Sequence, residues 1–271
     1  MAFFKLFPKI GYDLNNTGVL QNVVNIYRSI RPLREFVDDV SVYTLYEIKN
    51  GERPDIVSQR LYGTPDYYWT FFIVNDYLHD GLASWPMSQE DLSEYMRTEY
   101  DGFAITTRPV IRRNTDQLII DHENSLSGRF KLGETLTGSQ GNATGTLTKK
   151  LTDLNQLIVQ NVTGSFIGDP DAVPNQTEVV TGGTSEDSVD TYRVYKYLEA
   201  PYHYFVEDDI EQRVADNGIF IQGATPESNL SFLTNRAHLI NSNESRSSMR
   251  VVSPEYISQF VDKFEELLNN E

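Results

Sequence analysis

The clearest hydrophobic pattern in the chain begins at residues 42–48, where β-branched and aromatic residues partly alternate with polar ones. This pattern favours a β-strand, and the turn dipeptide Asn50-Gly51 ends it. A short helix is then expected to begin at Pro54, because proline suits the first helical position. Gly63 lies where a left-handed C-terminal cap belongs. The sequence therefore predicts a strand, a turn and a short helix in this order.

A second helix is predicted over roughly residues 65–74, with Thr64 as its N-cap. The face assigned to core packing carries Trp69, Phe72 and Ile73. Tyr67 and Phe71 lie on the neighbouring face, so the helix is apolar nearly all round. Such a helix is normally buried all round, and a compact unit of this size has too little interior to cover both faces. We therefore expect the rest of this chain, or another chain, to cover the second face.

Both ends of the chain are also apolar. The N-terminal residues 1–40 form a predicted arm with an aromatic tip, which either tucks under its own domain or docks on a neighbour. Near the other end, Ser253 and Pro254 begin a predicted amphipathic helix. In an ordinary protein such a helix packs more often on its own domain, and in an assembly subunit we expect it to pack on a partner. The candidate partner-interface residues are Phe3, Phe4, Phe7, Tyr67, Phe71, Phe260, Phe264 and Leu268.

The middle of the chain, residues 114–190, is rich in glycine, threonine and asparagine and has no helical period. An internal repeat is present, because residues 117–120 recur as residues 156–159 and residues 128–134 recur loosely as residues 164–169. Two copies of strand, glycine turn and strand predict a small all-β module built by duplication. The alternative is a surface insertion that only fills space.

Composition and charge exclude several classes of function. The formal net charge is −16, which repels phosphate backbones and anionic membrane surfaces, so we expect no nucleic acid and no membrane insertion. The chain contains no cysteine, which excludes disulfides and thiolate chemistry. No apolar run approaches 18 residues, and Lys5, Pro8 and Lys9 interrupt the apolar start. We therefore expect synthesis in the cytoplasm.

The search for chemistry gives no enzyme. The four histidines have no metal-ligand spacing, and the adjacent acids at 208–209 and 265–266 point in different directions on a helix. Nucleophile-elbow, P-loop and dinucleotide motifs are missing from the sequence. We predict no catalytic residues, no metal site, no cofactor and no small-molecule ligand.

Residues 26–96 carry a resemblance to known proteins. The spacing is similar to that of a LysM module, a small βααβ fold, in Tyr46-x-Ile48-Lys49-x-Gly51-Glu52, Val57-x-x-x-Leu61-Tyr62-Gly63 and Trp69-x-x-x-x-x-Asn75. A longer set resembles the baseplate wedge subunit of contractile-tailed bacteriophages that has a LysM-like core: Arg53-Pro54-Asp55, Tyr62-Gly63-Thr64-Pro65, Tyr68-Trp69, Asn75-Asp76 and Trp85-Pro86-Met87-Ser88. The resemblance weakens over the C-terminal helix and is absent from the middle of the chain.

The resemblance implies an α+β fold with a small LysM-like βααβ core, extended arms, an inserted all-β module and the C-terminal amphipathic helix. The expected segments are an arm at 1–40, the core and following helix at 41–113, the β module at 114–190 and a C-terminal region at 191–271. The implied function is structural, in the tail baseplate of the virion. There the subunit clamps or links other wedge proteins and neighbouring wedges around the central hub.

Glycan binding is the alternative function. LysM modules elsewhere bind N-acetylglucosamine polymers between two loops, which correspond here to residues 50–53 and 76–84. Trp85-Pro86-Met87 departs from the usual end of the second strand, and the chain carries one such module where glycan binders commonly carry several.

Overall fold

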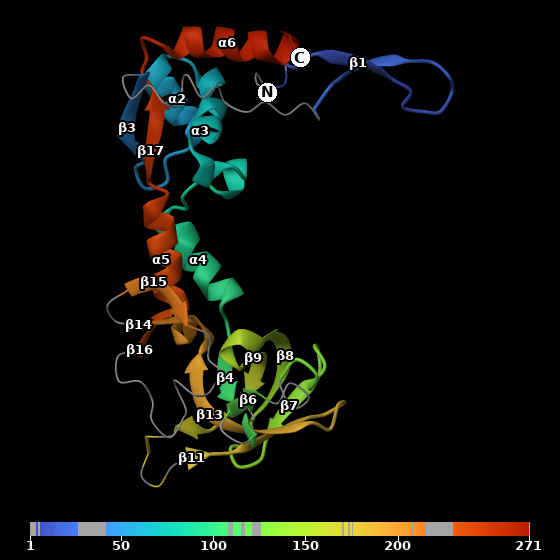
Figure 1. Cartoon of the computed structure of the whole chain (residues 1–271), viewed down its shortest axis with the longest axis vertical. Helices are drawn as coiled ribbons and strands as arrows, with labels where there is room; N and C mark the ends of the chain where they lie inside the picture. Colours follow the sequence, from blue (N-terminus) through green and yellow to red (C-terminus); the bar gives the residue numbers. More distant parts are fainter. Residues whose placement is uncertain are drawn as a thin grey trace. The chain divides into compact units, whose positions relative to one another are not determined.

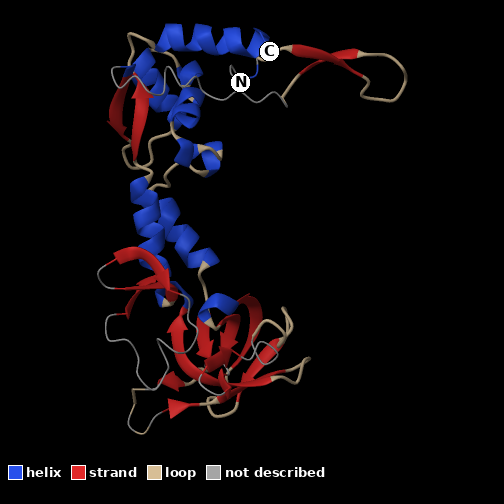
Figure 2. Ribbon diagram, in the orientation of Figure 1, coloured by secondary structure: helices blue, strands red, loops and turns tan. Residues whose placement is uncertain are grey.

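The structure is a computed structural model that describes residues 4, 6–26, 42–107, 111–114, 117–120, 126–169, 171–172, 174, 176–206, 209–214 and 230–270. The chain forms two compact units (Figure 1). Unit 1 contains Met1–Leu92 and Asn241–Glu271, and unit 2 contains Ser93–Ile240. Helices and strands occur in both units, which confirms the α+β class (Figure 2). The expected segments 41–113 and 191–271 each contribute to both units, and the four-segment division stays a prediction.

Unit 1 is built on a two-stranded sheet and two helices. Strand β3 (Tyr43–Glu47) pairs antiparallel with β17 (Ser248–Val252). Helix α2 (Pro54–Tyr62) follows β3 and ends at Gly63, whose φ of 75° is the left-handed cap that the sequence predicts. The predicted strand and first helix are thus confirmed.

The predicted continuous helix over residues 65–74 is wrong. The structure divides this segment into the 3₁₀ helix η3 (Pro65–Tyr67) and helix α3 (Trp69–Val74). At the division, the Thr70 hydroxyl donates to the carbonyl oxygen of Tyr67 at 2.8 Å, so a side chain satisfies a carbonyl at the end of the tight turn. Thr64 is the expected N-cap, because its side chain accepts a hydrogen bond from the Asp66 N–H.

The second strand of the core comes from the far end of the chain. Where the resemblance implies a strand soon after the second helix, the chain forms two 3₁₀ turns, η4 (Asp76–Leu78) and η5 (Gly81–Ala83). The partner of β3 is β17 instead. The core therefore has the order strand, helix, helix, strand, with all of unit 2 between its last two elements. Its LysM-like character stays a prediction.

Helix α3 is buried between two clusters of apolar side chains, as expected for a helix that is apolar all round. On one side Trp69 contacts α6 (Ile257–Asn270), which runs along α2 and α3 in Figure 1. On the other side Phe71 packs with Trp85 and with Met249 of β17. The rest of the same chain therefore provides the cover. The amphipathic C-terminal helix is confirmed, but it begins at Ile257, since residues 254–256 form a turn.

An N-terminal hairpin completes unit 1. Strands β1 (Lys9–Tyr12) and β2 (Gln21–Val24) pair antiparallel. Phe7, just before β1, is buried in the same cluster as Trp69 and α6. The base of the hairpin is therefore anchored in the core, while residues 9–22 are almost all exposed.

Helices α4 (Gln89–Glu99) and α5 (Asn235–Ser245) each contain residues of both units. Ser88 caps α4 as predicted, because its hydroxyl accepts a hydrogen bond from the Asp91 N–H at 3.0 Å.

Unit 2 contains a closed six-stranded barrel, which confirms a β module in this part of the chain. The order around the barrel is β12 (Val179–Gly182), β13 (Ser188–Lys196), β4 (Phe103–Thr107), β9 (Gln156–Thr163), β8 (Thr144–Leu151) and β7 (Thr135–Gly138). Large apolar side chains, including Ile105, Leu136, Leu147 and Leu157, fill its interior.

Smaller elements accompany the barrel in unit 2. Strands β5 (Ile111–Asn114) and β6 (Gln117–Ile120) form a hairpin, and β10 (Gly168–Asp169) pairs with β11 (Gln176–Thr177). A further sheet has the order β15 (Asp209–Val214), β14 (Pro201–Val206), β16 (Leu230–Thr234). The 3₁₀ turns η7 (Thr152–Leu154) and η8 (Tyr197–Glu199) are also present.

Two buried glutamates tie β7 and β12 together where these strands close the barrel. Glu134 precedes β7, and its carboxylate accepts hydrogen bonds from the N–H groups of Thr184 and Ser185, just after β12. Glu178 precedes β12, and its carboxylate accepts from the N–H groups of Gln140 and Gly141, just after β7. The residue before each strand is therefore a glutamate whose carboxylate holds the loop that follows the other strand.

Candidate interaction site

The structure places most of the predicted interface side chains in the interior of unit 1. Phe7, Phe71, Phe260, Phe264 and Leu268 are all buried by residues of this chain. In this conformation they form the core, and no surface of theirs is free for a partner. Tyr67 is half-buried and Phe4 is exposed, whereas Phe3 lies outside the described residues. Of the predicted core residues, Trp69 is buried and Phe72 and Ile73 are half-buried.

One edge of the core sheet is closed by side chains. The backbone of Ser248, Arg250 and Val252 in β17 points away from β3. Asn75 accepts from the Arg250 N–H at 2.9 Å and donates to the Arg250 carbonyl oxygen at 2.8 Å. The hydroxyls of Tyr77 and Tyr62 donate to the carbonyl oxygens of Ser248 and Val252. Burial raises the pKa of the Tyr62 hydroxyl, which stays a donor at neutral pH.

The opposite edge of the same sheet, on β3, is not paired by any residue that the structure describes. Ile48 N–H donates to the Ser247 carbonyl oxygen and Ser253 N–H donates to the Val42 carbonyl oxygen, so the even-numbered residues of this segment face β17. The backbone groups of Tyr43, Leu45 and Glu47 face outward, and no described residue bonds to them. The Leu45 side chain on this edge is 76% exposed. An open edge of this kind is a template for pairing with another strand.

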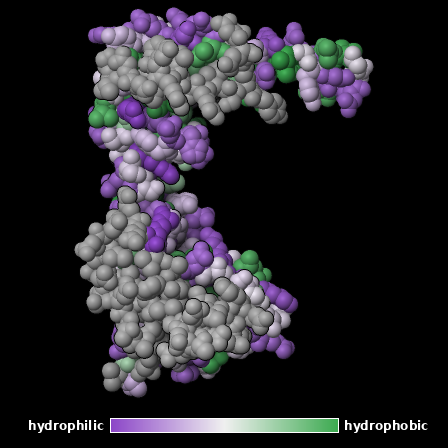
Figure 3. All heavy atoms as spheres, in the orientation of Figure 1, coloured by the Kyte–Doolittle hydropathy of each residue, from purple (hydrophilic) through white to green (hydrophobic). Residues whose placement is uncertain are grey.

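The N-terminal hairpin is the second exposed apolar feature of unit 1. It carries Ile10, Tyr12, Leu14, Val19 and Leu20 as exposed side chains, and Ile26 follows it. Figure 3 shows hydrophobic residues among hydrophilic ones on the hairpin. The one charged residue between Ile10 and Ile26 is Asp13, whose carboxylate accepts hydrogen bonds from the N–H groups of Asn15, Thr17 and Gly18. These bonds lower the pKa of Asp13, those from Gly18 and Thr17 most strongly, and they fix the turn. The hairpin is therefore an ordered, nearly uncharged apolar surface on a strongly acidic chain.

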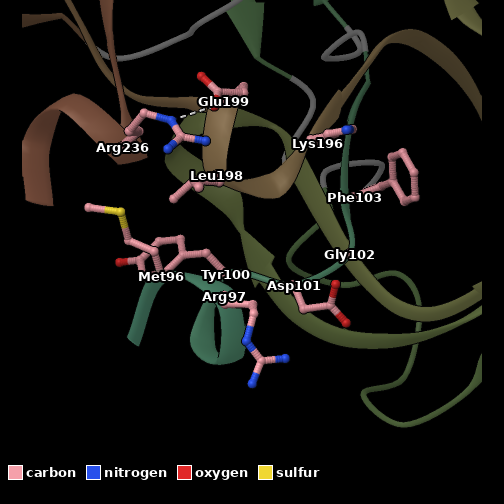
Figure 4. Close-up of a pocket in the computed structure, with 10 residues that line it drawn as sticks. All are labelled: Met96, Arg97, Tyr100, Asp101, Gly102, Phe103, Lys196, Leu198, Glu199 and Arg236. Atoms are coloured by element: carbon pink, nitrogen blue, oxygen red, sulfur yellow. Dashed lines mark hydrogen bonds and ion pairs between the residues drawn. The ribbon is translucent and has the colours of Figure 1, made fainter. Parts of the chain in front are cut away.

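Unit 2 has a hollow of about 300 Å³ between the end of α4 and η8 (Figure 4). Arg97, Lys196 and Arg236 lie around it, but Arg97 pairs with Glu94 and Arg236 pairs with Glu199. Tyr100 stacks on Tyr197 with ring centroids 4.9 Å apart, and burial raises the pKa of Tyr197 to about 12. The lining therefore combines these two ion pairs with packed aromatic rings, and Asp101 and Lys196 also contribute to it. Among the described residues no group of three His, Asp or Glu side chains could hold a metal ion.

Comparison with known proteins finds one family for the N-terminal part of the chain. Residues 1–107 match the family model described as "Base plate wedge protein 53". The match supports a baseplate wedge subunit. The family places it in the tail baseplate of the virion, in a structural role, where it interacts with other baseplate proteins. A search of curated proteins finds no match. No helix among the described residues is long and apolar enough to span a membrane.

Both exposed features lie within the matched part of this wedge subunit. The hairpin and β3 fall inside residues 1–107, whereas most strands of the barrel lie beyond it. Sequence reasoning found the aromatic residues near the hairpin but missed the hairpin itself. The turn-rich residues 11–18 between apolar residues are a signal that could have found it. The open edge of β3 leaves no mark in the sequence, because it depends on which distant strand takes the other edge.

The loops that would hold a glycan are used for internal contacts in this wedge subunit. Trp85 donates its indole N–H to the Glu52 carbonyl oxygen at 2.8 Å, and Gln89 N–H donates to the Asn50 side chain at 2.8 Å. The loop over residues 50–53 is thus tied to the start of α4. These contacts do not favour the glycan alternative.

Proposed function

We propose that this wedge subunit links neighbouring baseplate proteins through the apolar tip of its N-terminal hairpin. The observation that carries the proposal is the combination of an exposed apolar tip, with Leu14 57% and Val19 63% exposed, and a base anchored in the core by Phe7. An isolated two-stranded hairpin is marginally stable in water, and several exposed apolar side chains on one element mark a candidate interaction site. A partner that buries the tip accounts for both features.

The chemistry of the hairpin also selects the kind of partner. The chain has a net charge of −16, so most of its surface repels acidic proteins at long range. The hairpin projects one side chain with formal charge between Ile10 and Ile26, and that carboxylate is occupied by backbone N–H groups. The partner surface on the neighbouring wedge protein is therefore apolar, and binding is only weakly sensitive to salt.

The buried aromatic residues serve this function indirectly. Trp69, Phe260 and Phe264 join α3 to α6 and thus complete the cluster in which Phe7 sits. Their role is to hold the base of the hairpin in place, so that little conformational entropy is lost when the tip binds a partner.

The experiment compares two double variants in binding to purified wedge proteins of the same phage. Leu14→Ser with Val19→Ser removes the apolar tip and leaves β1 and β2 intact. Each side chain contributes on the order of 1.5 kcal/mol when buried, so the captured amount is expected to fall by at least about ten-fold. The matched control is Leu82→Ser with Leu132→Ser, two exposed leucines outside the hairpin, which should bind as the unsubstituted chain does. Equal capture by both double variants would overturn the proposal.

A further inference from the structure

The open edge of β3 and the open edge of β1 are complementary, and the structure assigns them to each other in neighbouring copies of the chain. We propose that β1 of one copy adds antiparallel to β3 of the next copy and extends the β3–β17 sheet. This inference rests on the proposed linking function. It assigns a partner to strand β1 of the hairpin, whereas the proposed function concerns the hairpin tip.

The backbone of β1 has outward-facing N–H and carbonyl groups that could pair with those of β3. Asn25 N–H donates to the Pro8 carbonyl oxygen, so residues 8, 10 and 12 face β2. Lys9 and Gly11 face outward, and no described residue bonds to their backbone. On β3 the outward residues are Tyr43, Leu45 and Glu47. Outward residues must lie opposite each other in a new antiparallel pair, which allows Lys9 opposite Glu47 together with Gly11 opposite Leu45.

The side chains fit this register. Lys9 and Glu47 are exposed, neither forms a salt bridge with a described residue, and the pairing brings them together. Gly11 leaves space for Leu45. A Cβ added at Gly11 would lie 3.5 Å from Leu20, so Leu20 borders that space on the same face of the hairpin. Leu45 and Leu20, at 76% and 70%, are the most exposed large apolar side chains among the described residues, and the pairing would bury them against each other.

The contact is head-to-tail, because a copy uses its hairpin on one side and its β3 edge on the other. Such contacts close into rings when the rotation between copies allows it. A pair of short strands is weak by itself, and the baseplate raises its occupancy by holding the copies close together.

The absence of cysteine allows a direct test by disulfide formation. Baseplates are assembled with an equal mixture of two full-length single-cysteine variants, Gly11→Cys and Leu45→Cys, and are oxidised before electrophoresis. The proposal predicts a crosslinked dimer in the mixture and none with either variant alone. In a second step, Lys9→Glu introduced into the Gly11→Cys chain should lower the crosslinked fraction about three-fold, and Glu47→Lys in the other chain should restore it.

Other occupants of the edge give other results, and each would overturn the inference. A dimer with Leu45→Cys alone means that β3 pairs with β3 of a second copy. A monomer closed internally in the Gly11→Cys, Leu45→Cys double variant means that the hairpin folds onto its own sheet. No crosslink in assembled baseplates means that neither pairing occurs. That last result leaves the proposed linking function intact, because the tip variants Leu14→Ser and Val19→Ser test it separately.

Discussion

The side-chain amide of Asn75 pairs with both backbone groups of Arg250, accepting from the N–H at 2.9 Å and donating to the carbonyl oxygen at 2.8 Å. In this way Asn75, which directly follows α3, takes the place of a third strand beside β17. The Asn75 amide also donates to the Phe71 carbonyl oxygen at 2.8 Å. One buried residue therefore joins the end of the helix to the sheet.

Replacing Asn75 by leucine is expected to destabilise unit 1 by about 3 kcal/mol, because it leaves the partly buried backbone groups of Arg250 and the buried carbonyl oxygen of Phe71 without the bonds from Asn75. Tyr77→Phe removes the hydroxyl that donates to the Ser248 carbonyl oxygen and to Asn75 Oδ1, and because Tyr77 is exposed it should cost about 1 kcal/mol or less. Denaturant titration of the full-length chain measures both. Equal effects for the two variants would contradict the role assigned to Asn75.

Trp69 joins α3 to α6, with its ring centroid 4.7 Å from that of Phe264 and 6.5 Å from that of Phe260. Trp69→Ala is expected to cost about 3–5 kcal/mol of stability. Phe264→Ala should cost a similar amount, and the double variant should cost less than the sum, because each substitution removes the same contact. Thermal melting with Leu82→Ala as the exposed control tests this, and an unchanged melting temperature for Trp69→Ala refutes the packing role.

Acid should weaken the barrel through Glu134. Burial alone would raise the pKa of this carboxyl, but hydrogen bonds from the N–H groups of Ser185, Lys131 and Thr184 and from the Ser185 hydroxyl lower the pKa below its ordinary value of 4.5. Because the folded-state pKa is the lower one, the stabilisation is fully present above pH 4.5 and is lost as the pH falls through the folded-state pKa.

Glu134→Gln should therefore lower the stability of the chain at pH 7 and flatten its decline below pH 4.5. Asp190→Asn, at an exposed position of β13, is the control and should keep the wild-type slope. Melting temperatures between pH 7 and pH 3 provide the comparison. A Glu134→Gln curve parallel to that of the wild type would show that this carboxylate does not stabilise the barrel.

Gly138 lies against the carboxylate of Glu178, and an added Cβ would lie 2.6 Å from Oε2. The carboxylate cannot move aside without losing its hydrogen bonds from Gln140, Gly141 and Ile167. Gly138→Ala is therefore expected to cost about 1–3 kcal/mol. Gly11→Ala, whose Cβ meets Leu20 at an ordinary 3.5 Å, should change the stability of the isolated chain by less than about 0.5 kcal/mol. Equal stability of the two variants would contradict the packing at Gly138.

Local signals in the sequence were sufficient for part of unit 1. Strand β3, the caps of α2 at Pro54 and Gly63, and the apolar stripe of α6 follow from patterns within a few residues. The long-range choices did not follow from them. Nothing in residues 65–74 indicates that Trp69 meets α6 or that Phe71 meets Met249, because periodicity reports which faces are apolar and not which distant segment covers them.

The same limit applies to the candidate site and to the barrel. The apolar N-terminal residues are evident in the sequence, but their division into a buried anchor at Phe7 and an exposed hairpin depends on where the core lies. The repeat in the middle of the chain predicted strands correctly at residues 117–120 and 156–159. It did not predict that only the second of these joins the barrel, or that Glu134 and Glu178 hold loops on the opposite strands.

The most direct test of the linking role is a reconstruction of the assembled baseplate in which this chain can be traced. The account predicts that Leu14 and Val19 at the tip of the hairpin are buried against an apolar surface of another baseplate protein, while Trp69 and Phe71 stay covered by α6 and β17 of the same chain. A hairpin tip that projects into solvent, with the neighbouring proteins held only by other surfaces, would contradict it.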